Sequence, residues 1–212
     1  TAKGVGIMKQ AVIFAGAPVQ PEQQPPVPAA DLYVCADAGV KLAQALGVVP
    51  DWIVGDFDSL GSVPEGENVE PFSPMKDDTD ILLAAKYALS KGCRRLVFYG
   101  ALGGRLDHTV ANLQMLRFLA DHGARGVLVD HAHWVTLQRG GTAVYPRRDG
   151  MYFSLFAMTE QCEDVTLEGV AYPLCHGKFS NAFPLGVSNE ILAENAVVTV
   201  GRGDLLVVYA RD

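Results

Sequence analysis

The sequence lacks the features that mark a membrane protein or a disulfide-rich secreted protein. None of its 212 residues lies in a continuous apolar run of about 18 residues, the length that a membrane-spanning helix needs. The N-terminus has no charged segment followed by an apolar stretch and a cleavage site. The four cysteines lie far apart and form no C-x-x-C pair, so neither a disulfide framework nor a redox motif is indicated. We therefore expect a cytoplasmic protein without a membrane partner, in which Cys35 and Cys93, beside apolar runs, are buried thiols.

Positive charge is also scarce. The chain has 17 Lys and Arg against 24 Asp and Glu, a formal net charge of −7, and it contains no run of basic residues. This balance disfavours nucleic acid as a partner, because phosphate backbones are bound by clustered Lys and Arg. With 49% hydrophobic and 19% charged residues, the composition is that of an ordinary globular protein. A small anionic substrate stays compatible with this charge, because a bound divalent cation reverses the local sign of the potential.

Short apolar runs alternate with segments of helical period over the first two thirds of the chain. This alternation predicts an α/β domain in which helices cover both faces of a parallel sheet. A segment rich in Pro and Gln, residues 19–28, is predicted to be a solvated loop. The predicted strands are residues 11–14, 32–35, 52–54, 96–99, 127–129 and 134–137, and the predicted helices are residues 40–46, 81–89 and about 109–121.

The pattern changes near Gln138, where the helical period ends. Short β-like runs separated by Gly, Pro and Asp follow, which predicts a second, all-β domain. Residues 201–204, Gly-Arg-Gly-Asp, lie between two alternating runs and predict a hairpin turn. The predicted domains are therefore residues 8–138 and 139–212.

Carboxylates follow the predicted parallel strands of the first domain. Asp37 follows one strand and the pair Asp56 and Asp58 follows the next, so these groups should meet at the carboxyl edge of the sheet. Residues 76–80, Lys-Asp-Asp-Thr-Asp, add three carboxylates at the start of a helix, where helix capping is a strong alternative interpretation. Carboxylates gathered in this way would repel one another unless a cation held them, and hard oxygen ligands select Mg²⁺.

A glycine-rich loop, residues 100–108, lies between a predicted strand and a predicted helix. Gly103 and Gly104 suit the close approach of backbone N–H groups to a phosphate, and Arg105 adds a fixed guanidinium fork for phosphate oxygens. For Asp107 and His108, helix capping is an alternative to ligand contact.

Six stretches together resemble bacterial thiamine pyrophosphokinases over nearly the whole chain. Their order and spacing carry the resemblance, because a G-D-F-D-S loop or an S-N-E triplet alone is not specific. The stretches are residues 36–39 (Ala-Asp-Ala-Gly), 50–59 (Pro-Asp-Trp-Ile-Val-Gly-Asp-Phe-Asp-Ser), 76–80, 100–112, 169–174 (Gly-Val-Ala-Tyr-Pro-Leu) and 187–190 (Val-Ser-Asn-Glu).

The resemblance implies a Rossmann-like N-terminal domain that binds ATP and Mg²⁺, a C-terminal β-sandwich that helps bind thiamine, and a homodimer with shared active sites. It implies metal ligation by Asp56, Asp58 and Asp80, with Asp77 in the same acidic shell, and a catalytic role for the first three and Arg105. Ser188 and Asn189 would bond the aminopyrimidine ring and Tyr172 would stack on thiamine, with a place in the sandwich core as the alternative for Tyr172. The residues expected around the nucleotide are Asp37, Gly39, Lys76, Thr79, Gly103, Gly104, Arg105, Asp107, His108 and Asn112.

Two other functions fit parts of this pattern. A diphosphokinase of the same fold acting on another alcohol, such as a hydroxymethyl pterin, would keep the acidic residues but lose Tyr172, Ser188 and Asn189. A non-catalytic thiamine-binding protein would show gaps in the set of carboxylates, and the sequence shows none.

Overall fold

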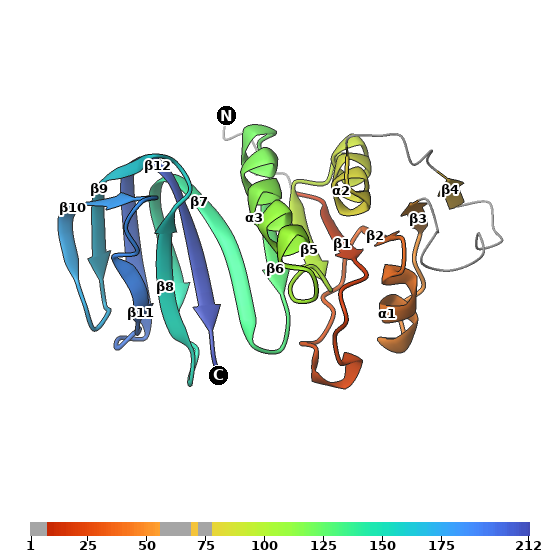
Figure 1. Cartoon of the computed structure of the whole chain (residues 1–212), viewed down its shortest axis with the longest axis horizontal. Helices are drawn as coiled ribbons and strands as arrows, with labels where there is room; N and C mark the ends of the chain where they lie inside the picture. Colours follow the sequence, from red (N-terminus) through yellow and green to blue (C-terminus); the bar gives the residue numbers. More distant parts are fainter. Residues whose placement is uncertain (1–7, 56–68, 72–77) are drawn as a thin grey trace, which may run out of the picture. The chain divides into compact units, whose positions relative to one another are not determined.

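The computed structural model describes residues 8–55, 69–71 and 78–212 (Figure 1). The chain divides into two compact units, Thr1–His131 and Ala132–Asp212. Among the described residues no helix has the length and apolar character needed to cross a membrane.

The first unit contains a sheet whose described strands all run parallel. Their order across the sheet is β6-β5-β1-β2-β3-β4 (Figure 1). The central strand β1 is apolar after Gln10, and its last four residues are fully buried, as expected for a strand covered on both faces. The strands are β1 (Gln10–Phe14), β2 (Leu32–Ala36), β3 (Trp52–Gly55), β4 (Val69–Pro71), β5 (Arg95–Tyr99) and β6 (Arg125–Val129).

Three helices pack on this sheet: α1 (Gly39–Ala45), α2 (Asp80–Ser90) and α3 (Leu106–Asp121). Helix α1 contacts β1 and β2, α2 contacts β1 to β3, and α3 contacts β6. Each helix is followed by a glycine in the left-handed conformation, Gly47, Gly92 or Gly123, which suits a residue without a side chain. The three predicted helices are confirmed, although α3 begins earlier than predicted. The loop at residues 19–28 contains one short 3₁₀ turn, η1 (Pro21–Gln23).

The strand order places a topological switch point beside β1. From β1 the chain moves outward through β2, β3 and β4, and it then returns to β5 on the other side of β1. The connections that leave β1 and β5 therefore run in opposite directions. In parallel sheets ligands bind in the crevice that such a divergence leaves at the carboxyl ends of the strands.

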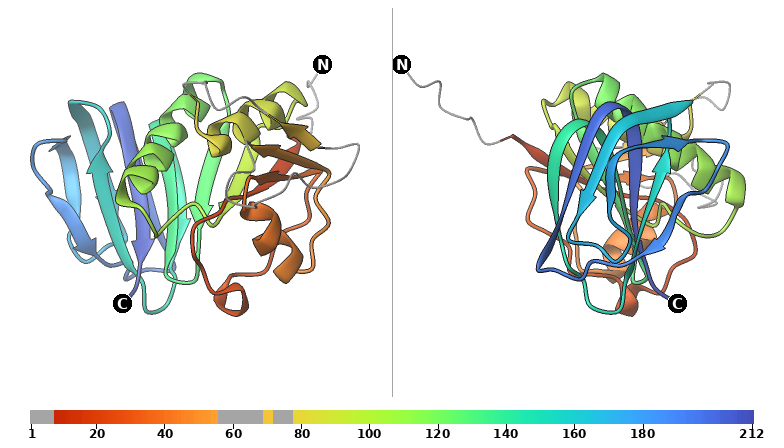
Figure 2. Two further views of the ribbon diagram at one scale, coloured as in Figure 1. Left: turned by 45° about the vertical axis from the view of Figure 1, so that its right-hand side comes forward. Right: turned by 90° about the vertical axis from the view of Figure 1, so that its left-hand side faces the viewer.

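The second unit consists of antiparallel strands and contains no helix in residues 132–212, all of which are described (Figure 2). Strand β12 pairs with β7 along most of its length, with β9 through its first half and with β8 through its second half. Aromatic and aliphatic side chains such as Phe153, Leu155 and Tyr209 form its core. The strands are β7 (His133–Pro146), β8 (Tyr152–Ala157), β9 (Gln161–Glu168), β10 (Leu174–Ser180), β11 (Gly186–Asn189) and β12 (Asn195–Ala210).

The hairpin predicted at residues 201–204 is wrong, because the chain passes through this segment inside β12. Val200 pairs with Gly141 and Asp204 pairs with Arg139, so the segment bulges against a single strand. Gly203 has φ +107°, and a side chain at Gly201 would lie 2.7 Å from Cβ of Asp164. Glycines that suit a hairpin turn suit a bulge equally well.

The predicted domain division between residues 138 and 139 falls inside β7, which begins at His133.

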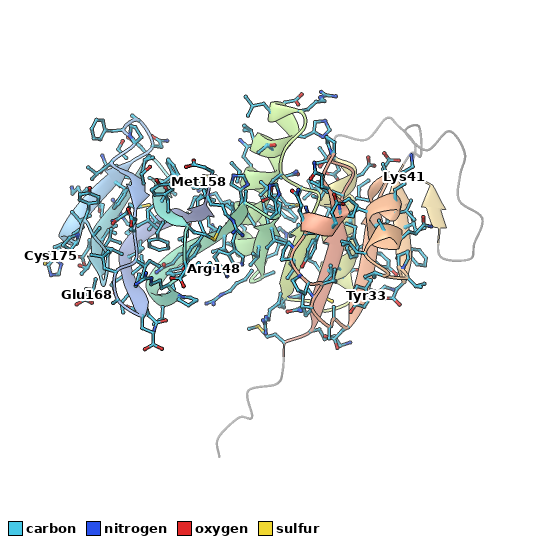
Figure 3. All side chains as sticks on the ribbon, turned by 90° about the horizontal axis from the view of Figure 1, so that it is seen from below. Tyr33, Lys41, Arg148, Met158, Glu168 and Cys175 are labelled. Atoms are coloured by element: carbon cyan, nitrogen blue, oxygen red, sulfur yellow. The ribbon has the colours of Figure 1, made fainter. Side chains whose placement is uncertain are left out.

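Three of the four thiols should react slowly with a thiol reagent because they are buried, and the fourth should react rapidly. Burial raises the pKa of the Cys35 thiol to about 12 and also raises the pKa of the Cys93 and Cys162 thiols, whereas Cys175 on β10 is exposed (Figure 3). Because the thiolate is the reactive form, we expect Ellman's reagent to modify one thiol per native chain rapidly and all four after denaturation. Cys175→Ser should remove the rapid phase, and a second rapid thiol would contradict this prediction.

Candidate active site

A pocket of about 400 Å³ opens where the parallel strands end in the first unit. It lies at the topological switch point, because the loops that follow β1 and β5 both line it. The end of β2 and the start of α2 complete the wall. The lining residues are 15–18, 36–38, 78–81, 83, 100, 101, 103–105, 108 and 112.

Backbone hydrogen bonds hold the two loops of the switch point together. The Ala15 N–H donates to Tyr99 O at 2.8 Å, and the Ala17 N–H donates to Gly100 O at 3.0 Å. Gly100 has φ +65°, and a side chain there would overlap the carbonyl oxygen of Ala15. Residues 15–18 were not predicted as part of the site. The available signal was Gly16, two residues after a buried strand.

The glycine-rich loop leads directly into α3. Gly103 and Gly104 have φ +84° and +66°, a conformation in which glycine avoids the strain of a side chain. Asn112, buried in α3, donates from Nδ2 to Ala101 O at 2.7 Å and so fixes the start of the loop. The first N–H groups of a helix have no partners within the helix and carry a partial positive charge. The loop and the start of α3 therefore offer backbone donors to an anion, while the His108 N–H donates to Asp107 Oδ1 at 2.9 Å.

Arg105 and Asp107 pair with each other at the rim of the pocket. The distances are 2.6 Å from Nη2 to Oδ2 and 3.1 Å from Nε to Oδ1. The hydrogen bond between them raises the pKa of Arg105 and lowers the pKa of Asp107, and both side chains are exposed. Arg105 and His108 line the pocket, whereas Asp107 does not. An anion that binds Arg105 must therefore compete with Asp107.

The acidic residues reach the pocket from two sides. Asp37, with φ +45°, follows β2, and its N–H donates to Val54 O at 2.7 Å. Asp80 begins α2, and Thr79 caps that helix, since its Oγ1 accepts from the Leu82 N–H at 3.4 Å. The capping interpretation of Thr79 is thus confirmed. Asp78 forms an ion pair of 2.6 Å with Lys86.

Four predicted residues, Asp56, Asp58, Lys76 and Asp77, lie outside the described residues. In the described part of the chain, no three His, Cys, Asp or Glu side chains are grouped so that they could hold a metal ion. The metal shell therefore stays a prediction, and Asp80 is the one predicted metal ligand among the described residues, where it lines the pocket.

Gly39 does not line the pocket. A side chain at Gly39 would overlap the carbonyl oxygen of Phe14, so the missing side chain lets α1 pack closely against β1. This packing accounts for a glycine at position 39 without a contact to a ligand.

In the second unit, two of the three predicted substrate residues line a small apolar pocket of about 140 Å³, whereas the third, Ser188, does not. Tyr172 and Asn189 line it together with Leu174 and Phe179. Tyr172 is 71% exposed, so the alternative that placed it in the core is wrong.

Asn189 holds the backbone of Tyr172 rather than projecting into solvent. It is buried, and its Oδ1 accepts from the N–H groups of Tyr172 at 3.0 Å and Glu190 at 2.9 Å, while Nδ2 donates to Tyr172 O at 2.9 Å. Ser188 is exposed in a left-handed conformation, with φ +58°, and its N–H donates to Ser154 Oγ at 3.0 Å. The two neighbours thus have different structural roles.

Comparisons with known proteins match both units. Residues 27–128 match the family model "Thiamin pyrophosphokinase, catalytic domain", and residues 142–204 match "Thiamin pyrophosphokinase, vitamin B1 binding domain". The chain belongs to the thiamine pyrophosphokinase family. The catalytic-domain match includes most of the residues that line the larger pocket, and the binding-domain match includes the smaller pocket around Tyr172.

Individual members of the family are similar over nearly the whole chain. Thiamine pyrophosphokinase of Bacillus subtilis (strain 168) is 26% identical over 189 residues, covering 85% of this chain and 88% of that protein. A crystal structure of the Bacillus subtilis enzyme has a TM-score of 0.85 at 25% identity and covers 96% of this chain and 100% of that chain. The Geobacillus thermodenitrificans enzyme has a TM-score of 0.81 at 28% identity, covering 96% and 98%.

The contacts of Asn189 and Ser188 predict that alanine substitution destabilises the fold at Asn189 but hardly at Ser188. Asn189→Ala should lower the free energy of unfolding by about 1–3 kcal/mol, because the partly buried backbone groups of Tyr172 lose their partners. Ser188→Ala should change it by less than about 0.5 kcal/mol, because its exposed side chain is not part of the core. Denaturant unfolding of both variants measures the difference. Equal destabilisation by the two substitutions would contradict the structural role of Asn189.

Proposed function

We propose that this chain is a thiamine diphosphokinase, which transfers the diphosphate group of ATP to the hydroxyl group of thiamine and releases AMP. The observation that carries the proposal is the pocket at the switch point, with its glycine-rich loop and helix N-terminus, in a chain whose two halves match the catalytic and vitamin B1-binding models of one family. The match to the binding-domain model favours thiamine over another alcohol as the acceptor.

The phosphates of ATP bind at the glycine-rich loop in this proposal. Gly103 and Gly104 let the backbone approach the phosphates, and the N-terminus of α3, which favours anions, follows the loop directly. Arg105, whose side chain is 74% exposed, exchanges Asp107 for a phosphate oxygen. Asn112 acts indirectly by fixing Ala101.

Two carboxylates at the pocket support the proposal that a Mg²⁺ ion accompanies the nucleotide. Asp37 and Asp80 both line the pocket, and carboxylate oxygens are the hard ligands that Mg²⁺ prefers. Asp56, Asp58 and Asp77 are the proposed further members of this shell. A bound Mg²⁺ would supply positive charge opposite the phosphate oxygens.

Thiamine binds through the second unit in this proposal. The exposed ring of Tyr172 offers a stacking surface, and the Ser188 hydroxyl offers a hydrogen bond. Because Asn189 already holds Tyr172 through both its oxygen and its amide, only its remaining amide hydrogen is available to the aminopyrimidine ring.

The reaction is an in-line displacement at phosphorus. The thiamine hydroxyl oxygen forms a bond to the β-phosphorus while the bond from that phosphorus to the oxygen shared with the α-phosphate breaks, and the hydroxyl proton is released. The chain contributes by holding the two substrates in line and by placing backbone N–H groups and Arg105 against the phosphate oxygens.

We also propose the finer layout of each unit. The switch point beside β1 supports a Rossmann-like sheet covered by helices on both faces. In the second unit, β12 changes partner from β9 to β8 near the bulge at Gly201 and Gly203, which supports a β-sandwich, since strands pass between packed sheets at bulges.

The products of the reaction with ATP and thiamine test the proposed function. Incubation with ATP, Mg²⁺ and thiamine should yield AMP and thiamine diphosphate in equal amounts, and ADP as product would contradict diphosphate transfer.

Asp80→Asn should lower kcat by at least about a hundredfold, because charge opposite the transferred group is worth several kcal/mol. Asp78→Asn is the matched control, because Asp78 lines the same pocket but pairs with Lys86. A similar loss in both variants would contradict a special role for Asp80.

A homodimer with shared active sites is tested by complementation. We expect the acidic residues of one protomer to act with Ser188 and Asn189 of its partner, so the inactive variants Asp80→Asn and Ser188→Ala/Asn189→Ala should restore activity when their subunits exchange. Random mixing makes about half the dimers hybrids with one intact site each, so about a quarter of wild-type activity should return. Native mass spectrometry confirms hybrid formation. Hybrids without activity would show that each chain builds its own site.

A further inference from the structure

The connection from β1 to β2 forms one wall of the larger pocket without a long helix to support it. We call residues 15–30 of this connection the strap. Its first four residues line the pocket, and its only helical turn is η1. Five prolines, at positions 18, 21, 25, 26 and 28, restrict its backbone. Other contacts must therefore fix the strap relative to the glycine-rich loop.

Tyr99 holds the strap at two points. Its carbonyl oxygen accepts from the Ala15 N–H at 2.8 Å, and its hydroxyl donates to Pro26 O at 3.0 Å. Tyr99 is also the residue before Gly100, where the glycine-rich loop begins. One residue thus ties the beginning and the far part of the strap to the end of β5.

The surroundings of the Tyr99 hydroxyl make this contact a fixed one. The side chain is 2% exposed, and its ring stacks on Phe14 with the ring centroids 5.7 Å apart. Burial raises the pKa of Tyr99 to about 12, so the hydroxyl keeps its proton and acts as a donor. A buried hydroxyl without a partner is costly, which favours the bond to Pro26.

The strap in turn supports the glycine-rich loop. A side chain at Gly104 would lie 2.9 Å from Cδ of Pro18, so the strap leaves room only for glycine at this position. Displacement of Pro18 would therefore alter the wall of the pocket next to Gly103 and Gly104. It would leave Tyr172 and Asn189, in the other unit, unchanged.

We propose that Tyr99 is a positioning residue for the nucleotide: its hydroxyl holds the strap so that Ala17 and Pro18 keep the wall of the ATP pocket in place. This inference rests on the proposed function only in naming ATP as the ligand. Tyr33, labelled in Figure 3, secures the end of the strap. Its hydroxyl donates to Pro28 O at 3.3 Å and accepts from the Ala30 N–H at 3.1 Å.

Tyr99→Phe tests the proposal, since it removes only the hydroxyl. Loss of one positioning hydrogen bond should raise the KM and the Kd for ATP about two- to tenfold. The kcat should change by less than twofold and the KM for thiamine should stay the same. Hydrogen exchange of the backbone amides in residues 15–28 should become faster. Titration of ATP by calorimetry gives the Kd without turnover, so the result stands even if no thiamine diphosphate forms.

Tyr209→Phe is the matched control. Tyr209 is equally buried, its hydroxyl donates to the carbonyl of Pro146 at 2.7 Å, and burial raises its pKa to about 12, but it lies in the second unit. Tyr209→Phe should destabilise the fold without changing the ATP affinity.

If Tyr99→Phe does not fold, Pro26→Gly replaces it in the test. This substitution keeps the carbonyl that accepts from the Tyr99 hydroxyl but adds backbone freedom at an exposed position, so it should also weaken ATP binding. The proposal would be overturned if Tyr99→Phe, or Pro26→Gly in its place, left the ATP affinity unchanged. It would also be overturned if Tyr209→Phe weakened ATP binding equally.

Discussion

The close approach of the chain after β1 to the chain after β5 is the constraint on which the larger pocket depends. Two backbone hydrogen bonds, from Ala15 and Ala17 to Tyr99 and Gly100, join the two loops. The approach is possible because position 100 has no side chain and adopts a positive φ. The strap, the glycine-rich loop and the start of α3 all continue from this junction, so their relative positions follow from it.

Local patterns predicted the elements better than the contacts between them. The helices follow from apolar period and glycine stops, both of which lie within a few residues. The crevice at the carboxyl edge followed from alternating strands and helices. Residues 15–18 were missed because Ala, Gly and Pro carry no titratable chemistry. The turn at residues 201–204 was misread because the partner strand, distant in sequence, decides between a hairpin and a bulge.

Several residues of the family's motifs contribute through the backbone that they hold. Gly39 admits the carbonyl of Phe14, Asn112 fixes Ala101, and Asn189 binds both polar groups of Tyr172. Sequence alone cannot separate such a role from ligand contact, because the same side chain suits both. The distinction needs the partner atoms, which come from elements far apart in the chain.

Two ion pairs beside the larger pocket affect how this acidic chain binds a triphosphate. Before a nucleotide binds, Lys86 balances Asp78 and Asp107 balances Arg105, so neither ion pair adds a full net charge to the pocket. The backbone donors of the glycine-rich loop and α3 supply only partial charges. Asp37 and Asp80 would repel phosphate oxygens, yet the same carboxylates attract a divalent cation. Nucleotide and cation should therefore bind cooperatively, each lowering the electrostatic cost of the other.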